Sequence, residues 1–249
     1  MIHIQSVNNG FDTSFFMNEE DFVMCTNTVD AYSQLLGKEV PQDIDEMPKT
    51  VWIPHYVYGD MFVEYENAER DMHERSQYIH FKPDPEKPEF IKGKVQKGNG
   101  GARKYMSVLE QSLRSFGIFE KHLAGWHTHL PLPGPIISYA DVWSFLIFKS
   151  DAFIHLIPNK DVVIGVFETK SVNRLKVRIE NIQNELSQAY WYLAKDTIKG
   201  VDELNSIFNT RGLILYISPI SLINQNKGVL LHQFGYSDHY LTQLQGRGM

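Results

Sequence analysis

A strand that ends in two histidines is the feature of this sequence that most restricts its fold and its chemistry. The segment Gly125-Trp126-His127-Thr128-His129 follows an apolar pair and precedes a loop that contains several prolines. In an extended segment successive side chains alternate between the two faces, so His127 and His129 point the same way and Thr128 points the opposite way. The sequence therefore predicts two imidazoles on one side of a strand end, which is half of a metal site.

A capped helix is expected after the proline-containing loop. Ser138 stands three residues before Asp141, and an apolar run begins at Val142. A serine followed at this distance by an acidic residue is typical of a helix N-terminus. Asp141 should then lie in the first helical turn, with its carboxylate facing back toward His127 and His129. Two imidazoles, one carboxylate and a water molecule form the ligand set of catalytic zinc, which keeps one exchangeable position.

Each half of this pattern also has a simpler explanation. A single histidine on an apolar strand is usually a hydrogen-bonded core residue, and the chain contains 10 histidines. Ser138 and Asp141 could form a capping box that has no connection with a metal. The occurrence of both motifs in the expected order of strands and helices nevertheless favours the metal site.

Together the motifs resemble the signature of the JAMM (JAB1/MPN/Mov34) zinc metalloprotease family, in particular its prokaryotic- or phage-type JAB domains. That signature is His-x-His, then seven residues, then Ser-x-x-Asp, with a separate glutamate upstream. Here the spacer between His129 and Ser138 has one residue more, and Leu130 stands where the family usually has proline. An apolar pair of strands predicted over 152–157 and 162–167 also fits the family.

The order of the elements before the histidines selects Glu74 as the upstream glutamate. A short strand near residue 52 precedes a helix whose apolar residues recur at three- and four-residue steps, the last of them Met72. Strands over 77–81 and 90–95 then form a hairpin. The resemblance places the family's glutamate at the start of such a hairpin, after such a helix. The glutamates of the helix itself remain alternatives for the same role: Glu64, Glu66 and Glu69.

The resemblance implies a fold, a cofactor and an activity. The fold would be α+β, the three-layer, cytidine-deaminase-like JAB/MPN fold, with a mixed β-sheet flanked by helices. Zn²⁺ would be bound by His127, His129 and Asp141. Glu74 would act as the general base, and Ser138 would donate a hydrogen bond to the developing oxyanion. The implied reaction is hydrolysis of an isopeptide or peptide bond in a ubiquitin-like protein conjugate or precursor.

Two other functions stay open. Many relatives in this family have lost metal ligands and serve as scaffolds or protein-interaction modules. The longer spacer and the sequence Arg75-Ser76-Gln77, which stands where the family usually has glycine-rich positions, favour that function, whereas the retained motifs oppose it. A zinc-dependent hydrolase or deaminase that acts on a small molecule would require a closed pocket. Family members that bind ubiquitin often have an additional segment after the helix that contains the aspartate. This sequence shows no long insertion after the Asp141 helix. A ubiquitin-like protein or a peptide is therefore a more suitable substrate than ubiquitin itself.

The length and the hydrophobic pattern predict one central domain with two additions. A chain of 249 residues that is 43% hydrophobic and 22% charged can bury one sizeable core. We expect an N-terminal extension of unknown role (1–48), a JAB/MPN-like domain (49–172) and a C-terminal extension of helices and strands (173–249). A long helix with an apolar stripe is predicted up to residue 195. The stripe predicts packing on the domain itself or, alternatively, a homodimer through the 173–195 helix.

Charge and composition restrict the expected partners and location. The net charge of -6 and the pI near 5.9 argue against a basic surface that binds the phosphate backbone of nucleic acids, so we expect no nucleic acid partner. No segment approaches membrane-spanning length, and the first residues lack the pattern of a signal peptide, so we expect no membrane partner and a cytoplasmic protein. Cys25 is the single cysteine, which excludes an intramolecular disulfide and a cysteine-rich zinc cluster.

Overall fold

The computed structural model describes the following residues: 33, 36, 38–58, 60–82, 89–98, 122–130, 137–139, 141–142, 154–159, 162–172, 179–219 and 228–235. Its helices are a short 3-10 helix (Ile44–Glu46), α3 (His55–Tyr58), α4 (Met61–Asp71), α7 (Ile179–Lys195) and α8 (Thr197–Asn209). Its strands are β1 (Thr50–Pro54), β2 (Arg75–Lys82), β3 (Glu89–Lys92), β4 (Gln96–Lys97), β5 (His122–His127), β6 (Ile154–Pro158), β7 (Val162–Glu168), β8 (Leu213–Pro219) and β9 (Gly228–Gln233).

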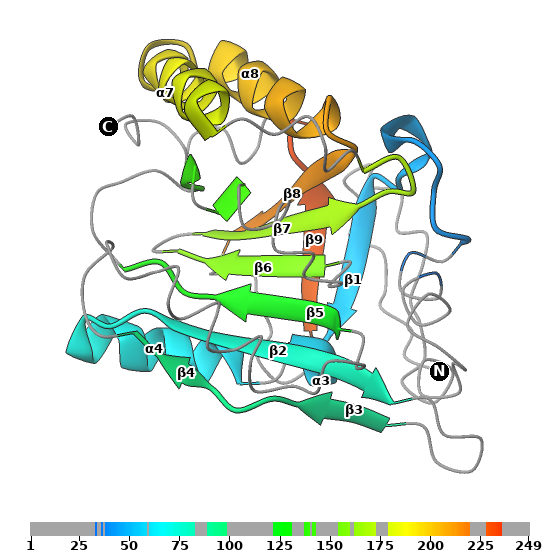
Figure 1. The fold of residues 1–249 in the computed structure, drawn as a ribbon, viewed down its shortest axis with the longest axis vertical. Helices are drawn as coiled ribbons and strands as arrows, with labels where there is room; N and C mark the ends of the chain where they lie inside the picture. The colour runs from blue at the N-terminus through cyan, green and yellow to red at the C-terminus, as the bar shows by residue number, and fades with distance from the viewer. Residues whose placement is uncertain are drawn as a thin grey trace, which may run out of the picture.

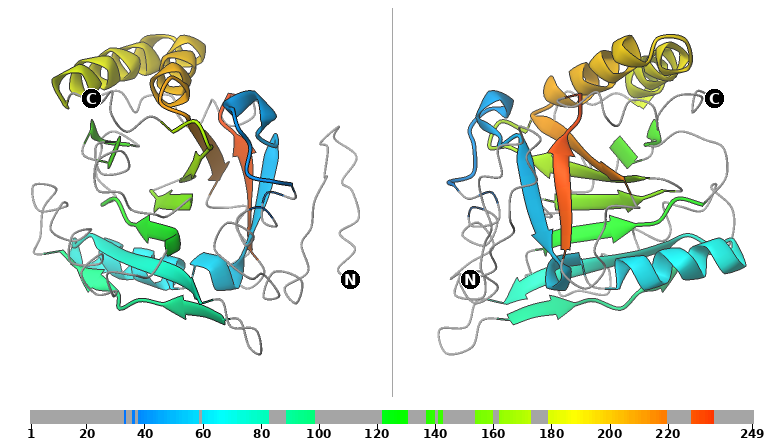
Figure 2. Two further views of the ribbon diagram at one scale, coloured as in Figure 1. Left: turned by 45° about the vertical axis from the view of Figure 1, so that its right-hand side comes forward. Right: turned by 180° about the vertical axis from the view of Figure 1, so that it is seen from behind.

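A mixed β-sheet forms the centre of the described part of the chain (Figure 1). The strand order is β1-β9-β8-β7-β6-β5-β2-β3, and β4 pairs with the beginning of β2. β5 and β6 run parallel, whereas the other paired strands are antiparallel. Figure 2 shows that the sheet curls, so that β1 and β9 stand at a steep angle to β2 and β3. The sheet and its helices confirm the α+β class.

The central strands are buried on both faces of the sheet. Every residue of β7 is buried. Val163 and Phe167 belong to a core cluster with residues of α3 and α4. The alternate residues Val162, Ile164 and Val166 belong to a second cluster with residues of α7 and α8. Because side chains alternate along a strand, the two clusters lie on opposite faces, and helices cover both of them. Figure 1 shows α7 and α8 beside β7 and β8, and α4 along β2.

The hairpin of β6 and β7 confirms the apolar strand pair expected after the histidine motif, with bounds that differ by at most two residues. The structure confirms that a helical segment precedes Glu74, but this segment consists of two helices, α3 and α4, and ends at Asp71. Met72 follows in the left-handed conformation (φ 57°) and is 40% exposed, so its expected place on the buried face was wrong. The sequence also predicts a helix over about 103–116, between the strand predicted over 90–95 and the histidines, and this segment lies outside the described residues.

The C-terminal part of the chain contributes to the same sheet. β8 pairs with β7, and β9 pairs with both β8 and β1. The apolar stripe of α7 is buried against the chain's own core through Ile182, Leu186, Ala189 and Leu193. A homodimer that uses α7 would therefore have to use the opposite face of the helix. None of the described helices is long and apolar enough to cross a membrane.

Candidate metal centre

The two histidines lie where β5 ends and are held by both neighbouring strands. The Thr128 N–H donates to the Arg75 carbonyl at 2.8 Å, and the Thr128 hydroxyl accepts from the Arg75 N–H at 3.0 Å. The His129 N–H donates to the carbonyl of Pro158, the last residue of β6, at 3.1 Å. Because both residues after His127 are bonded in this way, the backbone stays extended beyond the strand and keeps the two imidazoles on one side.

His127 lies on the face of the sheet that α7 and α8 cover. Its neighbour Trp126 belongs to the core cluster of the other face, and its indole N–H donates to Gln77 Oε1 at 3.1 Å. The alternation along β5 therefore turns His127 away from that cluster. The side chain of His127 is fully buried, whereas that of His129 is 13% exposed. A ligand at this point would be nearly shielded from solvent.

Asp141 lies in the first turn of a helix whose N-terminus has the expected capping-box geometry. The Ser138 N–H donates to Asp141 Oδ2 at 2.5 Å, and the Asp141 N–H donates to Ser138 Oγ at 3.3 Å. Both Asp141 and Val142 are buried. The reciprocal bonds fix the carboxylate of Asp141 relative to the backbone, so the cap and the metal-site hypothesis agree.

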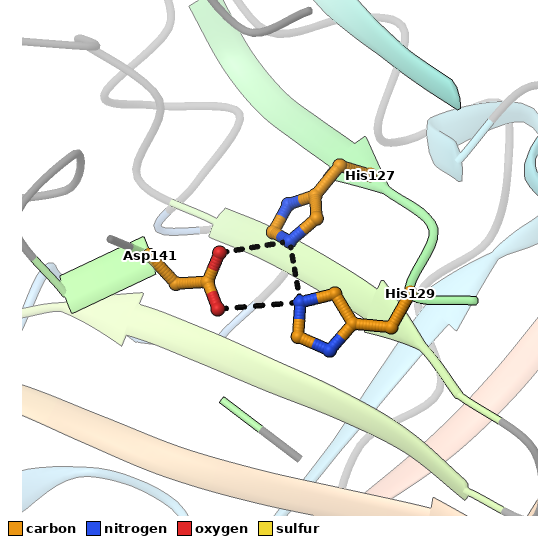
Figure 3. Close-up of side chains that lie close together, drawn as sticks. All are labelled: His127, His129 and Asp141. Atoms are coloured by element: carbon orange, nitrogen blue, oxygen red, sulfur yellow. Dashed lines mark hydrogen bonds and ion pairs between the residues drawn. The ribbon is translucent and has the colours of Figure 1, made fainter. Parts of the chain in front are cut away.

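The three side chains converge (Figure 3). The Nε2 atoms of His127 and His129 lie 3.2 Å apart. Asp141 Oδ1 is 3.1 Å from His127 Nε2, and Asp141 Oδ2 is 3.2 Å from His129 Nε2. Ligand atoms at about 2.0–2.1 Å from zinc in a tetrahedral arrangement lie roughly 3.3 Å from one another. The two imidazole nitrogens have this spacing, and with one oxygen of Asp141 the three ligand atoms lie within 4.8 Å of one another, so the group could hold a metal ion such as zinc.

The protonation states of His127 and Asp141 also suit a metal. Burial lowers the pKa of His127 to about 4, although Asp141 acts in the opposite direction, so the ring is neutral at pH 7. Burial acts to raise the pKa of Asp141, but His129 and His127 outweigh it and hold that pKa well below its ordinary value. A neutral imidazole and an ionised carboxylate are the forms that bind metals.

Sequence reasoning did not single out His155, which lies behind His127. Its Nε2 is 2.6 Å from His127 Nδ1, on the side of the ring away from Asp141. For His127 to bind a metal through Nε2, its proton must be on Nδ1, where His155 Nε2 can accept it. Gly125 pairs with His155 across the strands, and a Cβ there would lie 2.9 Å from Tyr78 and 3.1 Å from the ring of His155. A larger residue at this position would force the ring of Tyr78 or His155 to shift.

Glu74, the upstream glutamate expected from the resemblance, lies close enough to His129 and Asp141 for both to affect its pKa. It stands immediately before β2, and Ser76, two residues later, pairs with His127. Glu74 is 8% exposed, and its Oε2 has no hydrogen-bond partner among the described residues. Burial raises the pKa of Glu74 to about 7, while His129 lowers it and Asp141 raises it further. A buried carboxyl with a pKa near neutrality has the property that a general base requires.

The other glutamates considered for this role are on α4 and have different surroundings. Glu64 forms an ion pair with Arg75 at 2.6 Å, and Glu69 accepts a hydrogen bond from the Tyr65 hydroxyl at 2.9 Å. Glu66 is exposed. These surroundings therefore favour Glu74, whose pKa is affected by both His129 and Asp141.

The raised pKa of Glu74 predicts a pH-dependent stability for the metal-free protein. The folded state holds this proton up to about pH 7, whereas the unfolded chain releases it near pH 4.5. Stability therefore falls as the pH rises between these values, by roughly 3 kcal/mol. The variant Glu74→Gln lacks this dependence, so we expect it to be more stable than the parent at pH 8 and nearly equal to it at pH 4.5.

Urea unfolding followed by tryptophan fluorescence at both pH values measures this difference. Glu66→Gln, which changes an exposed glutamate of α4, is the matched control and should leave the stability unchanged at either pH. The same difference between Glu74→Gln and the parent at both pH values would contradict the assigned pKa.

The chain has no significant match to a protein-family model, to a curated protein or to a solved structure. The JAMM resemblance therefore rests on the sequence motifs, and the site is judged on its own geometry.

Proposed function

We propose that this protein is a zinc-dependent peptidase of the JAMM type with a JAB/MPN fold. Its reaction would be hydrolysis of an isopeptide or peptide bond in a ubiquitin-like protein conjugate or precursor. The observation that carries the proposal is the convergence of His127, His129 and Asp141: the two Nε2 atoms lie 3.2 Å apart, and each is 3.1–3.2 Å from one carboxylate oxygen. The buried carboxyl of Glu74 is close enough for His129 and Asp141 to affect its pKa.

The donor set fits zinc in number and in atom type, and His127 and Asp141 fit it also in their states of protonation. Two imidazole nitrogens and one carboxylate oxygen leave a fourth position open, which distinguishes catalytic from structural zinc sites. His155 supports the tautomer that His127 needs for binding through Nε2. Zinc bound there would supply Lewis acidity, which lowers the pKa of water and polarises a carbonyl group.

The residues of the chain would carry the proton transfers. Glu74 would take a proton from the attacking water and later pass it to the leaving amine. The Ser138 hydroxyl, whose oxygen already accepts from the Asp141 N–H, would donate its hydrogen to the oxyanion that forms from the scissile carbonyl. No side chain becomes covalently attached to the substrate in this scheme.

The alternative is an inactive scaffold with the same fold. The additional residue between His129 and Ser138 favours it, because a shifted loop could carry Asp141 away from the histidines. The distances of 3.1 Å and 3.2 Å from the Asp141 oxygens to the Nε2 atoms of His127 and His129 oppose it, because the carboxylate lies within reach of both rings. An enzyme and a scaffold differ in turnover, so activity separates them.

Metal removal tests the proposed activity. The zinc-loaded protein is incubated with linear fusions of ubiquitin-like proteins and with lysine-linked conjugates, and the products are identified by mass spectrometry. We expect cleavage at the amide bond that follows the ubiquitin-like C-terminus, loss of cleavage after chelation, and recovery when zinc is returned. A protein that holds one zinc per chain and cleaves none of these substrates would support the scaffold instead.

A further inference from the structure

The hydroxyl of Tyr190, on helix α7, binds Ile137, the residue that precedes the turn from Ser138 to Asp141. It donates to the Ile137 carbonyl at 2.5 Å and accepts from the Ile137 N–H at 2.9 Å. Both polar groups of the Ile137 backbone are thus satisfied by one side chain that lies 53 residues further along the sequence. Such a two-way bond fixes the position and the orientation of the peptide groups on both sides of Ile137.

Packing connects the same two segments. Ile137 and Val142, at the two ends of the turn, are fully buried. Both belong to the core cluster that contains Leu186 and Tyr190 of α7. Apolar packing alone would allow the turn to slide or rotate along the helix, whereas the two hydrogen bonds define one register. Burial also raises the pKa of Tyr190 above its ordinary value, so the hydroxyl keeps the proton that it donates.

We propose that Tyr190 is a positioning residue for the metal site, and that α7 holds the Ser138–Asp141 turn against the two histidines of β5. This inference rests on the proposed zinc site and extends it, because it gives helix α7 a role in metal binding. Tyr190 acts through Ile137 and Ser138 on the carboxylate of Asp141 and does not itself contact the metal.

Removal of the hydroxyl tests this role. In Tyr190→Phe the ring and its packing are kept, while both bonds to Ile137 are lost. Supporting partners of metal ligands typically contribute about 10- to 100-fold in affinity. We expect Tyr190→Phe to bind Zn²⁺ about 10-fold more weakly in competition with a chelator. We also expect an altered visible absorption spectrum for the Co²⁺-loaded protein, because the carboxylate ligand is displaced.

Two control variants on the same helix separate positioning from stability. Tyr192→Phe removes a hydroxyl from a ring that faces Lys199 of α8. Leu193→Ala removes buried apolar volume and should cost about 2–5 kcal/mol of stability. Both controls should keep the parent's Zn²⁺ affinity and Co²⁺ spectrum, although Leu193→Ala unfolds at a lower temperature.

The outcomes distinguish this inference from the proposed function. If the parent binds zinc and Tyr190→Phe binds it equally well with the same Co²⁺ spectrum, the inference fails and the zinc site stands. If Leu193→Ala weakens zinc binding as much as Tyr190→Phe, the effect is one of general stability and the inference also fails. If the parent binds no zinc, the proposed function fails first.

Hydrogen exchange in the unmodified protein tests the contact without a substitution. The Ile137 amide should exchange as slowly as the amides in the middle of α7, because the Tyr190 hydroxyl accepts from it in the core. Exchange at the rate of an unprotected amide would overturn the inference.

Discussion

The variant Glu74→Gln is expected to keep its zinc and to lose about 10²- to 10⁴-fold in the rate of amide hydrolysis. Glutamine has nearly the size of glutamate but cannot take a proton from water. Glu74 lies outside the group of three donors, so the metal affinity should change little. The measurement is a single-turnover rate on the fastest substrate of the screen, together with the zinc content of each preparation.

Glu66→Gln is the matched control for this substitution, because it makes the same chemical change at an exposed position of α4. It should retain the parent's rate. Full activity in Glu74→Gln would show that another group is the base. Loss of zinc from Glu74→Gln would instead make Glu74 a ligand, which contradicts the role proposed for it.

The variant Asp141→Asn is expected to lose at least about 100-fold in zinc affinity, since even a supporting partner of a ligand is worth about 10- to 100-fold. Asparagine keeps the shape of the side chain and an oxygen that can accept from the Ser138 N–H, so the helix start should remain capped. What it lacks is the negative charge that lies 3.1–3.2 Å from the two imidazoles. Isothermal titration of the metal-free protein with Zn²⁺ measures the loss.

Asp202→Asn, on the exposed face of α8, is the control for a lost carboxylate and should bind zinc as the parent does. Circular dichroism should show the same helix content for both variants and the parent. Parent-like affinity in Asp141→Asn would contradict the assignment of Asp141 as a ligand and would reduce its role to helix capping.

Local rules were sufficient to predict the parts of the site that are close in sequence. The alternation of side chains along an extended segment placed His127 and His129 on one side, and they lie with their Nε2 atoms 3.2 Å apart. The capping pattern of Ser138 and Asp141 predicted the reciprocal hydrogen bonds that the structure contains. Such features depend only on backbone geometry within a few residues.

The same local rules could not predict contacts that depend on the tertiary fold. His155 reaches His127 because β5 and β6 are parallel neighbours, and Tyr190 reaches Ile137 because α7 covers that face of the sheet. Neither residue stands in a motif. The alternation on β6 was a usable signal for His155, because it is a polar residue between Ile154 and Leu156, which face the other core cluster.

Periodicity was also misleading at one helix end. Met72 continues the apolar spacing of α4, but the helix stops at Asp71 and Met72 takes a left-handed conformation. The Arg75 side chain accounts for this end in part, since it forms ion pairs with Glu64 and Asp71 of the same helix and so holds the chain turned toward β2. The turn is what places Glu74 at the start of β2.

The measurement that tests the central claim most directly is the metal content of the purified protein and of its His127→Ala/His129→Ala variant, by elemental analysis after exposure to zinc. The site predicts about one zinc per chain in the parent and none in the variant. No zinc in either protein, or equal zinc in both, would contradict the claim that these histidines and Asp141 form a metal centre.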